Sequence, residues 1–298
     1  MTGESVGIVG VGNMGGRISR RILDGGWSLV GFDPVPEQLE RFGVAGAASL
    51  GDLVRAVEVV LFSLPDSRVI ESVVFGEDGV LASCSPRQVI VDLSTAAPSS
   101  SVRIHEAFHE QGVEFLDAGI SGGAAAAEKG TLSIMVGGSE AALERVRALL
   151  GTFSSNVYHL GSPGSGHTAK LLNNFLNGVS LAATAEVMVA ARKAGLDLPT
   201  FLDAVNHSSG VNFATLNRFP RIIEGDYLEG GLTGKLMTKD IELYVEMLGE
   251  LGVPSLNAPG CLASFGVATA LGYGDQISNR VVDALGDLAG GVRLYDAD

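Results

Sequence analysis

The stretch Val6-Gly-Ile-Val-Gly-Val-Gly-Asn-Met-Gly15 decides the fold of this chain, because an apolar run leads directly into the glycine spacing G-x-G-x-x-G. The residues that follow, 17–23, carry apolar side chains at helical spacing. Strand, glycine turn and helix in this order form a cradle in which backbone amides and a helix N-terminus approach a pyrophosphate. The residues expected to contact a dinucleotide here are Gly10, Gly12, Asn13, Met14 and Gly15.

A carboxylate strengthens this interpretation. Asp33 ends the next apolar run, about 20 residues past the glycines, where a carboxylate accepts hydrogen bonds from the ribose 2′ and 3′ hydroxyls. It would also repel a 2′-phosphate, and residues 34–37 supply no cation to attract one. The sequence therefore favours NAD as cofactor, with NADP possible. The alternative is an ordinary glycine turn followed by a solvated aspartate.

Composition narrows the class of partner. The 298 residues are 46% hydrophobic and carry a formal net charge of −14, which argues against nucleic acid or an anionic membrane surface. A small anionic substrate must then be attracted by local cations. The two cysteines, Cys84 and Cys261, lie far apart and lack metal-ligand spacing, so we expect free thiols and no metal site. No basic start with an apolar h-region precedes the first apolar run, so we expect no secretory signal and a cytoplasmic protein.

The order of the apolar patterns predicts an α/β fold. Short β-branched runs alternate with helical or turn patterns in the first half, which indicates a largely parallel sheet. The runs are 6–10, 28–33, 59–64, 89–93, 114–118, 132–136 and 157–160. From about residue 165, amphipathic patterns at 168–194, 198–205 and 239–251 replace them. We predict a Rossmann-type doubly wound parallel sheet in residues 1–163 and an all-helical domain in residues 164–298. The apolar stretch 171–194 contains amides and charges, so no membrane span is expected.

One polar stripe on the first long helix is a candidate for chemistry. Lys170, Asn174 and Asn177 recur at i, i+4 and i+7, so they share one face. Burying amides and an ammonium there is costly unless they are satisfied. The stripe therefore indicates a polar cavity, or else a network in which these groups satisfy one another or solvent.

Other candidates follow strands. Ser121, Gly122 and Gly123 come after the strand at 114–118, where hydroxyl and amide groups can hold a carboxylate. Leu64, Pro65 and Thr95 follow two earlier strands and are expected beside the nicotinamide half of the cofactor. Lys239 begins a later helical pattern together with an acid. Without further information, residues 121–123 are explained equally well as a glycine-rich turn, and Lys239 with its neighbouring acid as a surface ion pair.

Taken in order, these motifs resemble the β-hydroxyacid dehydrogenase family, which includes 3-hydroxyisobutyrate dehydrogenase and tartronate semialdehyde reductase. The segments that carry the resemblance are 10–15, 64–65, 92–95, 117–123, 130–132, 164–174 and 239–240. The resemblance implies that Lys170 is the catalytic acid and base and that Asn174 orients the substrate. It further implies that residues 121–123 bind the substrate carboxylate and that Lys239 lies near cofactor and substrate. It also implies a homodimer or homotetramer built on the helical domain, where Phe201, Phe213 and Phe265 offer apolar surface.

One segment departs from the family pattern, and the role of another has two explanations. Gly119-Ile120 stands where relatives commonly have Pro-Val, which loosens the backbone beside the carboxylate loop. The polar stretch 206–213 suggests a polar distal end of the substrate, although capping and turn roles explain it equally well. The rival functions are an imine or other carbonyl reductase, whose imine-reducing members generally lack the lysine, and a non-catalytic NAD(H)-binding module.

Overall fold

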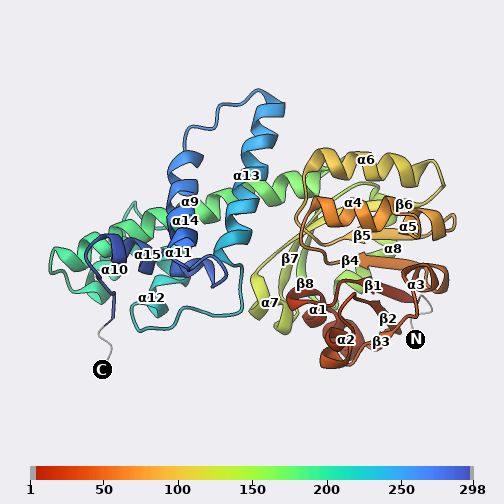
Figure 1. Cartoon of the computed structure of the whole chain (residues 1–298), viewed down its shortest axis with the longest axis horizontal. Coiled ribbons are helices and arrows are strands. Elements are labelled where there is room, and N and C mark those ends of the chain that lie inside the picture. Colours follow the sequence, from red (N-terminus) through yellow and green to blue (C-terminus); the bar gives the residue numbers. More distant parts are fainter. Residues whose placement is uncertain (1–4, 296–298) are drawn as a thin grey trace. The chain divides into compact units, whose positions relative to one another are not determined.

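The computed structural model describes residues 5–295, shown in Figure 1. The chain forms two compact units that divide after Lys170, within the long helix α9 (Ser165–Lys193). The predicted domain boundary at 163/164 falls just before this helix begins. The first unit contains the sheet, and the second is built from helices.

The sheet of the first unit has eight strands within the described residues, in the order β3-β2-β1-β4-β5-β6-β7-β8. The strands are β1 (Val6–Val9), β2 (Leu29–Phe32), β3 (Ala45–Gly46), β4 (Val59–Phe62), β5 (Val89–Asp92), β6 (Glu114–Ser121), β7 (Leu132–Gly137) and β8 (Ser154–His159). Only β6 and β7 pair antiparallel. All seven strands expected from the sequence are present, and the doubly wound α/β prediction is confirmed.

Helices cover both faces of this sheet, because each central strand is apolar on both sides. One core joins Val6, Ile8 and Leu61 to α1 and α8, and the other joins Val60 and Phe62 to α3, α4 and α6. Figure 1 shows α4 and α6 on one side of the strands and α1 and α7 on the other. The helices are α1 (Asn13–Asp24), α2 (Pro36–Phe42), α3 (Leu50–Ala56), α4 (Ser67–Phe75), α5 (Val80–Ser83), α6 (Pro98–His109), α7 (Gly123–Lys129) and α8 (Glu140–Leu150).

The topology places the candidate residues of this unit at one edge. The chain runs from β1 outward to β2 and β3, then returns to the other side of β1 with β4. Ligands of open α/β sheets bind beyond the carboxyl ends of the strands at such a switch point. The glycine turn follows β1 there, and Asp33 follows β2.

The second unit is helical and has its own core. It contains α10 (Leu198–Asn206), α11 (Phe213–Asn217), α12 (Phe219–Ile222), α13 (Gly234–Leu251), α14 (Ala258–Ala270), the short η1 (Ser278–Arg280) and α15 (Val281–Leu288), besides most of α9. Leu181 of α9, Ile241 of α13 and Phe265 of α14 are buried together. The expectation of apolar surface at Phe265 is therefore wrong, because this ring faces the core, whereas Phe213 is 58% exposed. None of the helices in residues 5–295 is both long and apolar enough to cross a bilayer.

Candidate active site and cofactor cradle

The glycine turn of the first unit has the shape that a pyrophosphate requires. Gly10 has φ +89°, and a Cβ there would lie 2.3 Å from the Ser63 carbonyl oxygen. A Cβ at Gly15 would lie 2.0 Å from the Gly10 carbonyl oxygen, so both glycines permit close backbone packing. A Cβ at Gly12 would instead enter open space at the start of α1. The turn therefore leaves room for a ligand directly before the first amides of this helix.

Asp33 holds this turn in place. Its half-buried carboxylate accepts hydrogen bonds from the Val11 amide at 2.7 Å and from the Val35 amide at 2.9 Å. An ionised carboxylate has about four acceptor sites, so these two bonds leave capacity for ribose hydroxyls. The acceptor capacity of Asp33 fits the hydroxyls of an adenosine ribose, and the same side chain links the end of β2 to the glycine turn.

The loops after β4 and β5 are linked by a serine that the sequence did not single out. Ser94 accepts a hydrogen bond from the Leu64 amide at 2.9 Å, and its own amide donates to Asp92 Oδ1 at 3.0 Å. Asp92 is fully buried, and burial raises the pKa of its carboxyl group. Thr95 follows in the same loop. Leu64, Pro65 and Thr95 thus lie on two loops that are fastened to each other at the edge where the glycine turn lies.

The segment expected to bind a carboxylate begins where β6 ends. Ser121 is the last residue of this strand, which runs three residues further than expected and pairs there with Ser133 of β7. Gly122 and Gly123 have φ of +126° and +70°, values that other residues rarely adopt. The backbone therefore turns sharply after the Ser121 hydroxyl, in a form that depends on these glycines.

A buried carboxylate anchors the start of α9. Asp117 of β6 accepts hydrogen bonds from the amides of Gly164 at 2.7 Å and His167 at 2.8 Å. The His167 ring lies 2.7 Å, Nδ1 to Oγ, from Ser101 of α6. A carboxylate at a helix N-terminus satisfies amides that lack a partner within the helix. Asp117 and His167 therefore fix the helix turn that precedes Lys170.

The stem of Lys170 packs against β6. A Cβ at Gly119 would lie 2.5 Å from the Lys170 Cβ, so the glycine at this departure from the family leaves the space that the lysine stem fills. Lys170 as a whole is 8% exposed. The side chain of Lys170 is therefore largely withdrawn from water at the start of α9.

In the second unit, Asn174 lies one helical turn after Lys170 on α9 and is 3% exposed. Its Nδ2 donates to Asp240 Oδ2 at 2.5 Å. Asp240 is 1% exposed, and its other carboxylate oxygen lies 3.2 Å from Lys239 Nζ. Sequence reasoning missed the role of Asp240, although an acid beside Lys239 on a largely apolar helix was a signal for it. The structure thus brings Asn174, Lys239 and Asp240 together.

Two further candidates, Asn177 and the polar stretch 206–213, form contacts within the helical unit. Asn177, the third residue of the stripe, accepts a hydrogen bond from Arg218. The polar stretch 206–213 caps α11, because Asn212 and Thr215 form a reciprocal capping box. Residues 5–295 contain no group of three or more His, Cys, Asp or Glu side chains that could hold a metal ion.

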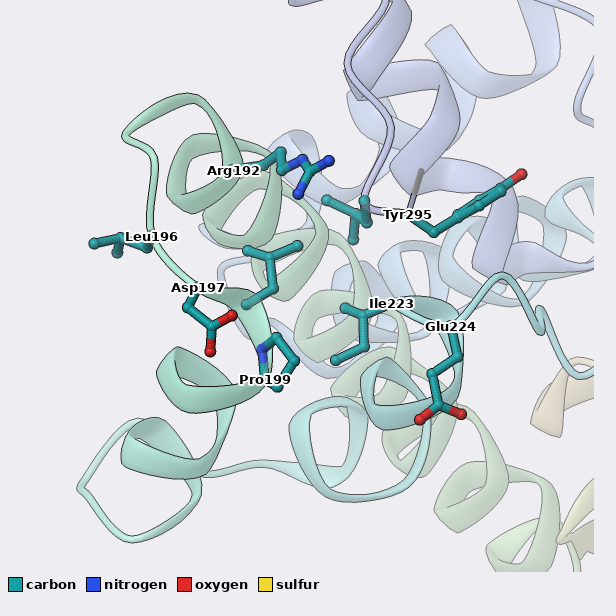
Figure 2. A pocket seen from close by; sticks show the side chains of 9 residues that line it. Arg192, Leu196, Asp197, Pro199, Ile223, Glu224 and Tyr295 are labelled. Carbon is teal, nitrogen blue, oxygen red and sulfur yellow. The ribbon is translucent and has the colours of Figure 1, made fainter. Parts of the chain in front are cut away.

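A surface pocket of the second unit lies apart from these residues. It is formed where α9 ends and α10 begins, together with the turn after α12 and the last described residues (Figure 2). Figure 2 shows that Arg192, Asp197 and Glu224 are among its lining residues. None of Asn174, Asn177 and Lys239 lines it, so this pocket is separate from the candidate active-site residues of the unit.

Comparisons with known proteins match both units. Residues 5–161 match the NAD binding domain of 6-phosphogluconate dehydrogenase, and residues 164–285 match the NAD-binding domain of NADP-dependent 3-hydroxyisobutyrate dehydrogenase. The 2-(hydroxymethyl)glutarate dehydrogenase of Eubacterium barkeri is 31% identical over 96% of each chain. The NAD-dependent L-serine dehydrogenase of Pseudomonas aeruginosa is 36% identical over 82% of this chain and 85% of its own.

Solved structures agree. The 3-hydroxyisobutyrate dehydrogenase of Mycobacterium tuberculosis, solved with L-serine, superposes with a TM-score of 0.86 at 28% identity, covering 95% of this chain and 99% of its own. An imine reductase from Pseudomonas sp. shares the fold alone, with a TM-score of 0.62 at 20% identity over 95% of this chain and 99% of its own. The resemblance seen in the sequence is confirmed over both units. The chain belongs to the β-hydroxyacid dehydrogenase family, the NAD(P)-dependent oxidoreductases that act on the CH–OH group of small hydroxy acids.

Proposed function

We propose that this protein interconverts a small β-hydroxy acid and its semialdehyde with NAD, and that Lys170 is the general acid and base. The observation that carries the proposal is the pair Lys170 and Asn174, both nearly buried one turn apart on α9. An amine and an amide with this spacing can reach one substrate oxygen.

The residues that would hold the cofactor are those of the cradle described above. Gly10, Gly12, Asn13, Met14 and Gly15 would contact the pyrophosphate, and Asp33 the ribose. The loops with Leu64, Pro65 and Thr95, together with Lys239, would line the nicotinamide half. A nicotinamide held there would supply the hydride acceptor for alcohol oxidation and the hydride donor for the reverse reaction.

The protein side chains would then bind the substrate hydroxyl oxygen and transfer its proton. Lys170, as the neutral amine, takes the hydroxyl proton as the alcohol becomes a carbonyl, and returns that proton in the reverse direction. Asn174 holds the same oxygen, while Ser121 and the amides of Gly122 and Gly123 fix the substrate carboxylate. Fixing both ends sets the orientation of the reacting carbon, which is worth several powers of ten in rate.

A substrate panel tests this function. The purified protein is incubated with NAD and 3-hydroxyisobutyrate, L-serine, L-threonate, 3-hydroxypropionate or 2-(hydroxymethyl)glutarate, and NADH absorbance is followed. We expect formation of NADH with at least one of these acids. Activity on cyclic imines with none on hydroxy acids would support the imine reductase alternative, and NAD binding with no turnover of either class would support a non-catalytic module.

Asp33 is expected to set the preference for NAD over NADP. Asp33→Ser removes the charge that opposes a 2′-phosphate, so we expect the ratio of kcat/KM for NAD to that for NADP to fall at least tenfold, or about 1.4 kcal/mol. The wild-type and variant ratios are measured with the best acid of the panel. A wild-type ratio already in favour of NADP would contradict the assignment.

Asp240 is expected to position Asn174. Asp240→Ala removes the acceptor of the Asn174 amide, and we expect kcat to fall about 10–100-fold, a loss of about 1.4–2.7 kcal/mol. Asp240→Asn keeps an acceptor oxygen at the same place and should recover part of that loss. If both variants turn over at the wild-type rate, the positioning role is wrong.

We further propose that the protein is a homodimer or homotetramer and works in the cytoplasm. Exposed apolar side chains of the helical unit, including Leu176, Phe213 and Leu256, support self-association. The free thiols Cys84 and Cys261 suit a reducing compartment. Light scattering after gel filtration measures the mass, and a monomer at micromolar concentration would contradict the oligomer.

A further inference from the structure

Arg218 of the helical unit is a half-buried cation with no acidic partner. Its Nη1 donates to Asn279 Oδ1 at 2.7 Å, and its Nη2 donates to Asn177 Oδ1 at 2.9 Å. Within residues 5–295, its guanidinium forms no ion pair with a carboxylate. Two neutral amides orient a guanidinium but do not neutralise it. A cation removed from water in this way is costly unless an anion joins it.

The surroundings of Arg218 also favour the binding of an anion. Burial lowers the pKa of the guanidinium to about 10, so the group keeps its charge at neutral pH while it is poorly solvated. The exposed ring of Phe213 lies 5.8 Å from its central carbon. Two of its five N–H donors are used by the amides, and no hydrogen bond to the described residues engages the other three. These donors can form a bidentate pair of hydrogen bonds with the two oxygens of a carboxylate.

Arg218 is also held rigidly. Asn279, which accepts one of its hydrogen bonds, is 2% exposed, and its Nδ2 donates to the Tyr227 carbonyl oxygen at 2.8 Å. That bond sets the direction of the Asn279 amide, so its oxygen faces Arg218. A cation oriented before a ligand arrives loses little freedom on binding, which favours affinity.

The position of Arg218 relates it to the candidate active-site residues of the same unit. Asn177 follows Asn174 by three residues on α9, which is about 4.5 Å along the helix axis. Asn174 and Asn177 lie on the face that also carries Lys170. A substrate whose hydroxyl oxygen is held by Asn174 would therefore meet the guanidinium about one helical turn further along, several bonds from the reacting carbon.

We propose that Arg218 binds a second anionic group of the substrate, so that the protein prefers β-hydroxy acids with a carboxylate distal to the hydroxymethyl group. This inference rests on the proposed function. It accounts for a cation that donates a hydrogen bond to this face of α9 in a chain whose formal net charge is −14, where a dianionic substrate must be attracted by local positive charges. It also gives a role to the third residue of the polar stripe, because Asn177 orients the guanidinium.

The first test compares two acids on the wild-type enzyme. 2-(Hydroxymethyl)glutarate and 3-hydroxyisobutyrate both carry a hydroxymethyl group beside a carboxylate, and only the former has a second, distal carboxylate. We expect kcat/KM with saturating NAD to be at least tenfold higher for the diacid, mainly through KM. The distal half-ester of the diacid should lose this advantage, because it keeps the length of the chain but not the charge.

The second test changes the cation. Arg218→Gln should lower the ratio of kcat/KM for diacid over monoacid at least tenfold, and Arg218→Lys should recover part of the ratio. Arg221→Gln is the matched control, because Arg221 lies three residues away in α12 and is exposed and ion-paired with Asp226. This control should keep the wild-type ratio. NAD affinity and the thermal midpoint report whether each variant is folded.

Two outcomes would overturn the inference. One is equal kcat/KM for the two acids on the wild-type enzyme, a result that needs no variant to fold. The other is a diacid preference that survives Arg218→Gln. In either case, Lys170-dependent oxidation of 3-hydroxyisobutyrate would leave the proposed function standing, whereas no oxidation of any hydroxy acid would remove the proposed function itself.

Discussion

Lys170→Ala is expected to lower kcat by about 10²–10⁴-fold, the usual contribution of a positioned acid or base, while the affinity for NAD changes less than twofold. The reason is that the alanine cannot take the hydroxyl proton, whereas the glycine turn and Asp33 that would bind the cofactor are unchanged. Stopped-flow measurement of NADH formation and a fluorescence titration with NADH give the two quantities. Turnover at the wild-type rate would remove the assignment of Lys170.

One further variant separates proton transfer from charge, and a second serves as its control. Lys170→Arg keeps a cation, but a guanidinium does not release its proton near neutral pH, so a loss similar to that of the alanine variant is expected. Lys193→Ala is the matched control, because Lys193 lies in the last turn of the same helix and, within residues 5–295, bonds only the Ala289 carbonyl oxygen, at 3.0 Å. The control should turn over normally. Recovery of activity in Lys170→Arg would indicate an electrostatic role instead.

Gly166→Ala is expected to have the largest effect on stability. A Cβ at Gly166 would lie 2.2 Å from the Asp117 carbonyl oxygen and 2.5 Å from the Met135 carbonyl oxygen, both of them backbone atoms of the sheet. Neither strand can move without breaking its hydrogen bonds, so we expect a loss of about 3 kcal/mol in the free energy of unfolding. The first turn of α9 would also shift, and with it Lys170, so kcat should fall as well.

The control for this substitution is Gly260→Ala in α14, where a Cβ would meet nothing within 4 Å. An alanine there should stabilise the protein by about 0.5–1 kcal/mol through helix propensity. Urea unfolding of both variants measures the difference. Equal stability of Gly166→Ala and the wild type would contradict the close packing of the first turn of α9 against β6 and β7.

The fold was largely predictable because buried parallel strands have a strong sequence pattern. Strands such as β4 and β5 have nearly continuous apolar sequences, since helices cover both faces of the sheet. The missed strand, β3, has only two residues, both exposed, and no apolar pattern. The extension of β6 to Ser121 was missed because its pairing with β7 depends on residues that follow in the chain.

The candidate site was predictable only in part. Short motifs identified Lys170, Asn174 and the glycine turn, since their chemistry depends on local spacing. Asp240 and Arg218 could not be assigned in this way, because their partners lie 66 and 41 residues away in the chain and meet only in the fold. At Gly119 the sequence predicted a loosened backbone, and this stays a prediction. The structure adds a close approach of Lys170 to β6, which the sequence did not indicate.

The measurement that tests the central claim most directly is NADH formation from NAD and the panel of hydroxy acids, by the wild-type protein and by Lys170→Ala side by side. The account predicts NADH formation with at least one β-hydroxy acid and a fall of at least about 100-fold in the variant. Equal rates in the two proteins, or no NADH from any hydroxy acid by a wild-type protein that binds NAD, would contradict it.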